Sequence, residues 1–179
     1  SCNKNEQKSE NFKTAYIDTA ELLKEYEKFK VEDERFKVKS EEMGRPLEAK
    51  FKAFQNEAQS FENNARAKGM QWAQQKGTEL QQREQQLGME QNALIQQLQV
   101  EGAQLRDSII KEVKQYIKDY GKKEGYDYVY GTGDAATILY AKDSYDITKE
   151  LIEKLNKDYA KTSGTEPKKV EATKEEEKK

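Results

Sequence analysis

Apolar residues recur in alternating steps of three and four along most of the chain, and this periodicity limits the possible folds more than any other feature. One such stripe runs from Leu22 to Trp72 and a second from Leu80 to Tyr120. A stripe of this spacing lies on one face of an α-helix and forms the seam of a coiled coil. Only 34% of the residues are hydrophobic and 37% are charged, which suits a narrow seam better than a large globular core. We therefore expect two long helices.

The glycine-flanked segment 69–77 (GMQWAQQKG) separates the two stripes. If the first helix begins near Thr19 and the second ends near Glu124, a symmetric hairpin turns at about residue 71, inside this segment. Each helix would then hold about 50 residues and, at about 1.5 Å per residue, would be roughly 75 Å long. The sequence thus predicts an antiparallel coiled-coil hairpin arm over residues 21–120, with its tip near 69–77.

The first stripe changes phase by one residue where Gly44 and Pro46 lie. In a symmetric hairpin Gly102 would lie close to Ser40, so both helices would be weak at one height. Interior Gly costs about 1 kcal/mol and interior Pro about 3 kcal/mol relative to Ala. We expect a kink here, and the alternative is that Pro46 begins a new helical segment, where it is tolerated.

The segments that flank the hairpin have strand-like patterns. Residues 12–18 (FKTAYID) are expected to form a short strand, and YDYVY and TILYA, joined by GTGDAA, two more. A closing helix (ITKELIEKLNKDY) follows, capped by Thr148 or Asp146. We therefore predict an α+β, mainly α chain in which residues 12–20 with 121–160 form a small β-containing base.

Polar sequence lies at both ends. Residues 1–11 read as a polar tether, and residues 161–179, with their blocks of Lys and Glu, are expected to be disordered. Cys2 lies at the start of the tether and is followed by its polar stretch, as in bacterial lipoproteins, whose mature chain begins at a lipid-carrying cysteine. We expect lipidation of Cys2, and the alternative is an incidental exposed thiol.

The composition argues against several functional classes. The chain has no His and one Cys, which removes Ser-His-Asp and Cys-His catalysis and the usual zinc sites. A net charge of -2 provides no field for nucleic acid. The string GTGDAA matches a dinucleotide-binding pattern but leads into a strand-like segment instead of a helix, so we interpret it as a loop. We predict a protein that is not an enzyme and that uses no cofactor or metal.

Two apolar surfaces are candidates for binding another polypeptide. At the tip, Trp offers a large contact area and Met adapts to varied shapes, although Trp72 could simply cap the coil. Along the first stripe, several Phe face a second helix rich in Gln, which could leave them partly exposed. The candidate binding residues are Phe51, Phe54, Phe61, Arg66, Lys68, Met70, Trp72 and Lys76.

The segment GYDYVYGTGDAATILYAKDSYDITKELIEKLN, residues 125–156, closely resembles the Skp/OmpH family of periplasmic chaperones. A strand followed by a helix (YIDTAELLKEY) and a coiled-coil hairpin precede it, so the resemblance covers roughly residues 12 to 157. It implies a homotrimer in the periplasm of a Gram-negative bacterium. Three arms would enclose a cavity that holds unfolded outer-membrane proteins without ATP.

A three-stranded piece with an isolated long hairpin would leave strand edges and apolar surface exposed in a monomer, and trimerisation through the base would bury both. The expected oligomerisation residues are Tyr16, Ile17, Val129, Ile138, Leu139 and Tyr140. The chain is nearer neutral than many members of the family, so client binding would rest on apolar contacts more than on charge. Two alternatives to a holdase stay open: a structural coiled-coil tether or adaptor of the cell envelope, and a tip that docks on membranes.

Overall fold

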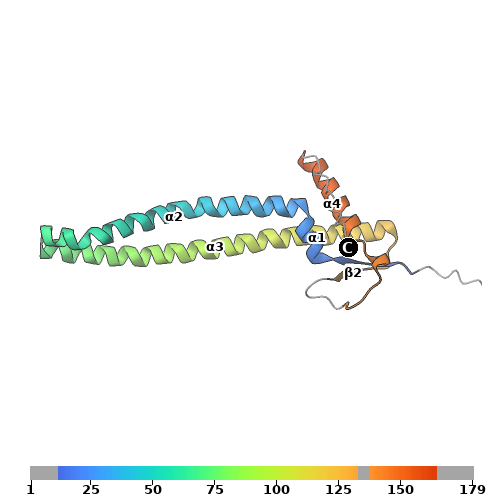
Figure 1. The fold of residues 1–179 in the computed structure, drawn as a ribbon, viewed down its shortest axis with the longest axis horizontal. Helices are drawn as coiled ribbons and strands as arrows, with labels where there is room; N and C mark the ends of the chain where they lie inside the picture. The colour runs from blue at the N-terminus through green and yellow to red at the C-terminus, as the bar shows by residue number, and fades with distance from the viewer. Residues whose placement is uncertain (1–11, 133–137, 165–179) are drawn as a thin grey trace, which may run out of the picture. The chain divides into compact units, whose positions relative to one another are not determined.

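The computed structural model describes residues 12–132 and 138–164. Its elements are, in order, β1 (Thr14–Asp18), α1 (Thr19–Glu25), α2 (Glu27–Lys68), α3 (Met70–Glu124), β2 (Tyr128–Thr132), the short 3-10 helix η1 (Asp143–Tyr145) and α4 (Thr148–Ser163) (Figure 1). This confirms the mainly α fold, with two long helices packed as a hairpin and a small β part. Cys2, the polar tether, most of the GTGDAA loop and residues 165–179 of the tail lie outside the described residues.

The chain divides into two compact units, and the division falls inside α2 and α3. The base unit consists of residues 1–31 with 110–179, and the hairpin unit of residues 32–109. The division lies further along the helices than the limits of 21 and 120 expected for the arm. Across the described residues, no helix combines the length and apolar character that crossing a membrane requires.

In the hairpin unit, α2 and α3 lie side by side and antiparallel (Figure 1). The turn between them is short: α2 ends at Lys68, Gly69 has a φ of 89°, and α3 begins at Met70. Glycine adopts this left-handed backbone without the steric cost that a Cβ would bring. The rest of segment 69–77 forms the first turns of α3.

Three ion pairs fix the register of the two helices. Lys39 pairs with Glu101 at 2.6 Å, Lys50 with Glu90 at 2.7 Å, and Glu57 with Arg83 at 2.6 Å. The partners are separated by 11 and then 7 residues on α2, and by the same 11 and 7 on α3. Neither helix therefore gains or loses a residue between these pairs.

The zone around Gly44, Pro46 and Gly102, where both helices were expected to be weak, is helical on both sides of the hairpin. Helix α2 runs through Pro46 without interruption, so a new segment does not begin there. A Cβ on Gly102 would lie 3.2 Å from the Phe36 ring, so Gly102 faces Phe36, one helical turn before Ser40.

The sheet of the base unit has two parallel strands, with Thr14 opposite Tyr128 and Asp18 opposite Thr132. The expected strand TILYA is not observed, because residues 138–141 form no strand. The second edge of β1 is instead occupied by the segment before α4, where the Ile147 N–H donates to the Tyr16 carbonyl at 3.1 Å. This segment, and not TILYA, therefore lies beside β1.

The base unit holds a compact apolar core beneath this sheet. Asp18 caps α1, and its side chain accepts from the N–H groups of Ala20 and Glu21 at 2.9 Å each. Of the two expected caps of α4, Asp146 accepts the Thr148 N–H, while the Thr148 hydroxyl accepts from the Asp18 N–H. The buried apolar side chains of this unit are Ala15, Ile17, Leu22, Tyr26, Val113, Tyr120, Ile147, Leu151 and Leu155.

The periodicity predicted one continuous helix from near Thr19, and this prediction is wrong. It is interrupted at Tyr26, whose ψ of 113° is extended, so α1 and α2 are separate helices. Asn156 of α4 hydrogen-bonds to the backbone on both sides of this residue. A tertiary contact thus overrides the local helical preference.

Candidate functional site

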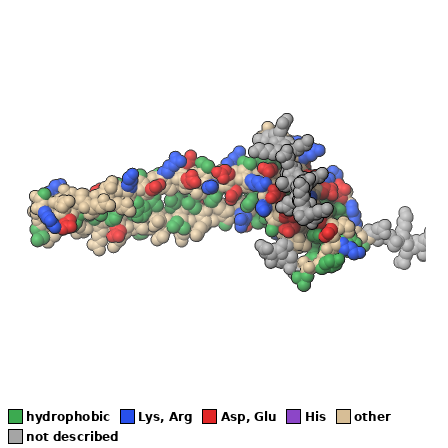
Figure 2. Space-filling view, viewed as in Figure 1, with side chains coloured by type: hydrophobic (Ala, Val, Ile, Leu, Met, Phe, Trp, Pro, Cys, Tyr) green, Lys and Arg blue, Asp and Glu red, His purple; other side chains and the backbone are tan. Residues whose placement is uncertain are grey.

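The apolar face of α2 in the hairpin unit is only half covered. We call this face the hairpin seam and define it by Phe36, Leu47, Phe51, Phe54 and Phe61, all of which are partly exposed. None of the 42 residues of α2 is buried. In a hairpin of two helices, each helix covers only one side of the other. Helix α3 also has many short or polar side chains, so it covers the aromatic rings of α2 incompletely. Figure 2 shows apolar side chains reaching the surface between the charged ones along the hairpin.

Helix α3 adds further exposed apolar groups to the same unit. Met89, Ile95 and Val100 are 67%, 46% and 56% exposed. Among the described residues of the hairpin unit, only Leu87 and Ile109 are buried. An open groove of about 630 Å³ lies over Phe36 and Leu105. The hairpin unit therefore presents a long, shallow apolar surface instead of one deep pocket.

The tip gathers aromatic and cationic groups next to the turn. The rings of Phe61 and Trp72 stack with centroids 5.9 Å apart, and the Lys68 ammonium lies 4.8 Å from the Trp72 ring centroid. Gly77 leaves room for the Phe61 ring, which is 3.8 Å from where a Cβ would be. Trp72 is thus partly packed onto the coil, whereas Met70 is 76% exposed.

The remaining predicted cations of the tip are engaged in ion pairs. Arg66 pairs with Glu62, one turn earlier on α2. Lys76 lies 2.9 Å from a Glu57 carboxylate oxygen and 3.0 Å from Glu79. Of the four predicted charged and aromatic contacts at the turn, Lys68 and Trp72 lie together, while Arg66 and Lys76 bind acidic neighbours.

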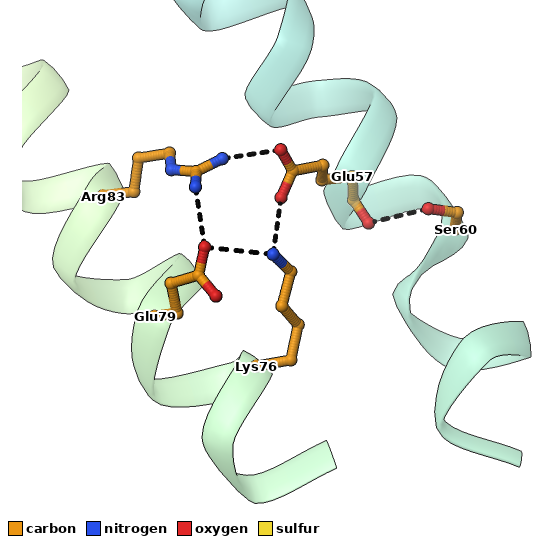
Figure 3. Close-up of polar contacts among 5 residues, drawn as sticks. All are labelled: Glu57, Ser60, Lys76, Glu79 and Arg83. Atoms are coloured by element: carbon orange, nitrogen blue, oxygen red, sulfur yellow. Dashed lines mark hydrogen bonds and ion pairs between the residues drawn. The ribbon is translucent and has the colours of Figure 1, made fainter. Parts of the chain in front are cut away.

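Figure 3 shows the network that links α2 to α3 just below the tip. Arg83 donates to Glu57 at 2.6 Å and to Glu79 at 2.7 Å, and Lys76 contacts the same two carboxylates. One Glu57 oxygen is enclosed, and Lys76 reaches it as an ion pair without the direction of a hydrogen bond. The ammonium of Lys76 and then the guanidinium of Arg83 hold the pKa of Glu57 below its usual range. The network fixes the register close to the turn.

The same pattern of charge borders the seam further from the tip. Lys39 holds the pKa of Glu101 below its usual range, and Lys50 does the same for Glu90. Each pair lies at the edge of the apolar face and joins one positive to one negative side chain, so its charges cancel. The seam is therefore an apolar surface between nearly neutral borders, in agreement with the net charge of -2.

A second apolar surface lies on the base unit. The Tyr128 and Tyr130 rings stack at 5.7 Å, and Phe12, which is 64% exposed, contacts Tyr128 at 5.7 Å. Leu139 and Tyr140 are 97% and 82% exposed. We call these five residues the base patch.

The residues predicted for oligomerisation have different surroundings. Leu139 and Tyr140 belong to the base patch, and Tyr16, Val129 and Ile138 are half-buried. Ile17 is 1% exposed and belongs to the core of the protomer. Strand alternation explains the last result, because Ile17 and Ala15 share the face of β1 that points into the base unit.

A set of tyrosine and carboxylate pairs, not predicted from the sequence, connects helices of the base unit. The Tyr120 hydroxyl donates to Glu150 at 2.8 Å, and the Tyr116 hydroxyl to Asp158 at 3.2 Å. Burial and the charge of Asp158 raise the pKa of Tyr116 to about 12. A signal was present, since tyrosines at seam positions need a partner for the hydroxyl when they are buried.

The arrangement offers binding surfaces. Across the described residues, no three His, Cys, Asp or Glu side chains gather as ligands for a metal ion.

Comparison with curated proteins gave no match. The family profile described as outer membrane protein (OmpH-like) matches residues 13–155, which is most of the chain and includes both units. The chain therefore belongs to the OmpH-like family of outer membrane proteins.

Proposed function

We propose that this protein is a periplasmic holdase that binds unfolded outer-membrane proteins without ATP, in a cavity between the hairpin arms of a homotrimer. Family membership supports a chaperone-type function toward outer-membrane proteins in general. The OmpH-like family is a family of chaperones and not of enzymes. The finer mechanism follows from the surfaces of the hairpin and of the base.

The observation that carries the proposal is the hairpin seam. A 42-residue helix with five Phe and no buried residue keeps part of its aromatic face accessible to a partner. Contiguous exposed apolar surface marks interaction sites in soluble proteins. Many weak contacts along the seam can hold an unfolded chain and release it again, so the cycle requires no nucleotide.

The base patch supports trimer formation. An exposed leucine and three exposed tyrosines beside a two-stranded sheet leave apolar area and a strand edge that association would cover. In the proposed trimer, residues 138–141, which form no strand within one chain, pair with a neighbouring copy.

The holdase function is tested by the aggregation of a urea-unfolded outer-membrane β-barrel protein after dilution. We expect the purified protein to suppress light scattering at a ratio of about one trimer to one client. The triple variant Phe51→Ser, Phe54→Ser, Phe61→Ser should lose most of this activity. The matched control Gln55→Ala, Gln59→Ala, Asn63→Ala changes exposed positions in the same turns and should keep it.

Two results would decide against the holdase. No suppression by the natural sequence, even in excess, would leave the coiled-coil tether as the better function. Equal activity of the two triple variants would show that the seam is not the binding surface. Circular dichroism of both variants is needed to show that the hairpin still forms.

The trimer is tested by mass measurement in solution. We expect three times the chain mass of 20.8 kDa for the natural sequence and the mass of one chain for Leu139→Ser with Tyr140→Ser. These side chains are too exposed for the double variant to unfold the protomer. A natural sequence that is monomeric at micromolar concentration would contradict the trimer. Mass spectrometry of the protein from its natural membrane fraction tests the predicted lipid on Cys2.

A further inference from the structure

The interruption between α1 and α2 has no cause in the local sequence. The residues around it are Glu25, Tyr26, Glu27 and Lys28, with neither Gly nor Pro. Glu and Lys are good helix formers, and Tyr is only slightly worse. The periodicity likewise predicts one helix through this point. Another part of the molecule must impose the extended backbone of Tyr26.

Asn156 on α4 replaces two of the hydrogen bonds that a continuous helix would make here. Its Oδ1 accepts from the Glu27 N–H at 2.8 Å, and its Nδ2 donates to the Glu25 carbonyl at 3.0 Å. In an uninterrupted helix, the Glu27 N–H would donate to residue 23 and the Glu25 carbonyl would accept from residue 29. The side-chain amide thus substitutes for a peptide group on each side of Tyr26.

The side chain of Tyr26 is held in place by the same part of the base unit. It is 2% exposed, its ring meets Tyr159 of α4 edge-on at 6.4 Å, and its hydroxyl lies 3.1 Å from Glu112 of α3. The backbone of Tyr26 keeps helical bonds on both sides, since its N–H donates to the Leu22 carbonyl and its carbonyl accepts from the Lys30 N–H. The φ of Tyr26, -73°, is already helical, so joining the two helices requires a change in its ψ from 113° to the helical range, which also turns α1 relative to α2.

We propose that the break at Tyr26 is a conditional hinge that exists only while α4 is docked and Asn156 holds the backbone on both sides. When α4 is released, α1 and α2 join into one helix through Tyr26. The state of the first turns of α2, the helix that carries the hairpin seam, is thereby coupled to the docking of α4. This inference goes beyond the proposed function and does not depend on what the seam binds.

The test is the backbone conformation of Tyr26, measured by NMR from its 13Cα and 13Cβ shifts in the full chain. The natural sequence should give extended shifts at Tyr26, and Asn156→Ala should give helical shifts there, with slower amide exchange at Glu27. Lys157→Ala changes the exposed neighbour of Asn156 and should match the natural sequence. Extended shifts retained in a folded Asn156→Ala variant would overturn the proposal.

Asn156→Asp provides a second reading if the alanine variant does not fold. An ionised aspartate can accept from the Glu27 N–H but cannot donate to the Glu25 carbonyl, whereas a protonated one can do both. The extended shifts of Tyr26 should therefore weaken at pH 7 and return near pH 4 in this variant, while the natural sequence keeps them at both values. Shifts of Asn156→Asp that are independent of pH and equal to those of the natural sequence would sink the hinge.

Discussion

The base unit and the hairpin unit belong to one chain but are stabilised in different ways. The base unit buries apolar side chains from β1, α1, α3 and α4 around one core, whereas the hairpin unit buries only Leu87 and Ile109 among its described residues. The hairpin compensates with ion pairs at fixed spacing, and each exposed pair contributes at most about 1 kcal/mol. In the proposed function, the hairpin unit supplies the binding surface and the base unit supplies the buried core.

The largest expected effect compares equivalent leucines of the two units. Leu151 is 0% exposed in the core of the base unit, whereas Leu94 on α3 is half-exposed. Leu151→Ala should lower the free energy of unfolding by about 2–5 kcal/mol, since it leaves a cavity. Leu94→Ala should cost less, about 1–2 kcal/mol, because part of its surface already contacts water.

Urea unfolding followed by circular dichroism measures both costs, at one protein concentration because association contributes to stability. The m-value must stay constant for the comparison to hold. Equal costs at the two positions would mean that the hairpin has a core that a partner chain supplies, and the contrast between the units would then apply to a single chain only.

The turn of the hairpin provides the next test. Gly69 has a φ of 89°, and Ala in such a conformation costs about 1–2 kcal/mol. Gly69→Ala should loosen the tip, where the single tryptophan, Trp72, stacks on Phe61 and reports locally by fluorescence. We expect the Trp72 transition to move to lower urea while the circular dichroism of the whole chain changes little. A transition at the natural urea concentration would show that the turn can adopt another conformation without strain.

The family, the two helices and the place of the turn followed from the sequence because each rests on a local or periodic signal. Glycine at 69 and the apolar steps of three and four are readable without knowledge of tertiary contacts. The break at Tyr26 was not predictable, since Asn156, which hydrogen-bonds to the backbone there, is distant in sequence. TILYA was predicted from its local composition alone, whereas the segment before α4 lies beside β1 in the folded chain.

Within the candidate site, the sequence indicated which residues could bind a partner, but not which of their side chains are exposed and which are already paired within the hairpin. Met70 is open to a partner, but Lys76 binds two glutamates of the same hairpin. Charge pairing across helices depends on which residues face each other, and the seam periodicity alone does not give this to within one residue. Burial of Ile17 likewise depends on which face of β1 meets the core.

Two interior glycines of α3 offer a smaller and opposite effect. Nothing lies within 4 Å of a Cβ built on Gly88, so Gly88→Ala should stabilise the hairpin by about 0.8–1 kcal/mol through helix propensity. A Cβ on Gly102 would be 3.2 Å from the Phe36 ring, which must move to accept it. Gly102→Ala should therefore gain less or lose stability, as measured by urea unfolding. Equal gains at both sites would show that the Phe36 ring moves freely, and hence that the seam is looser than its half-burial indicates.

The smallest expected effect is a pH dependence that belongs to the hairpin unit. The pKa of Glu57 is lowered in the folded chain by Lys76 and Arg83, so ionised Glu57 stabilises the network at neutral pH. This contribution is complete above the ordinary Glu pKa of about 4.3 and is lost as the pH falls through the lower, folded value. The natural sequence should exceed Glu57→Gln in the urea midpoint of Trp72 fluorescence at pH 7, and the difference should shrink toward pH 3.

A control at Glu84, an exposed carboxylate of the same unit, separates this effect from general acid unfolding. Glu84→Gln should follow the natural sequence throughout the titration, because no structural network of α2 and α3 is changed. If Glu57→Gln and Glu84→Gln gave parallel curves, the network of Figure 3 would not fix the register, and the constant spacing of 11 and 7 residues would have to come from the apolar seam alone. If only Glu57→Gln departs at pH 7, charge pairs hold the register while the seam stays free to bind, which is the division that distinguishes the hairpin from the base.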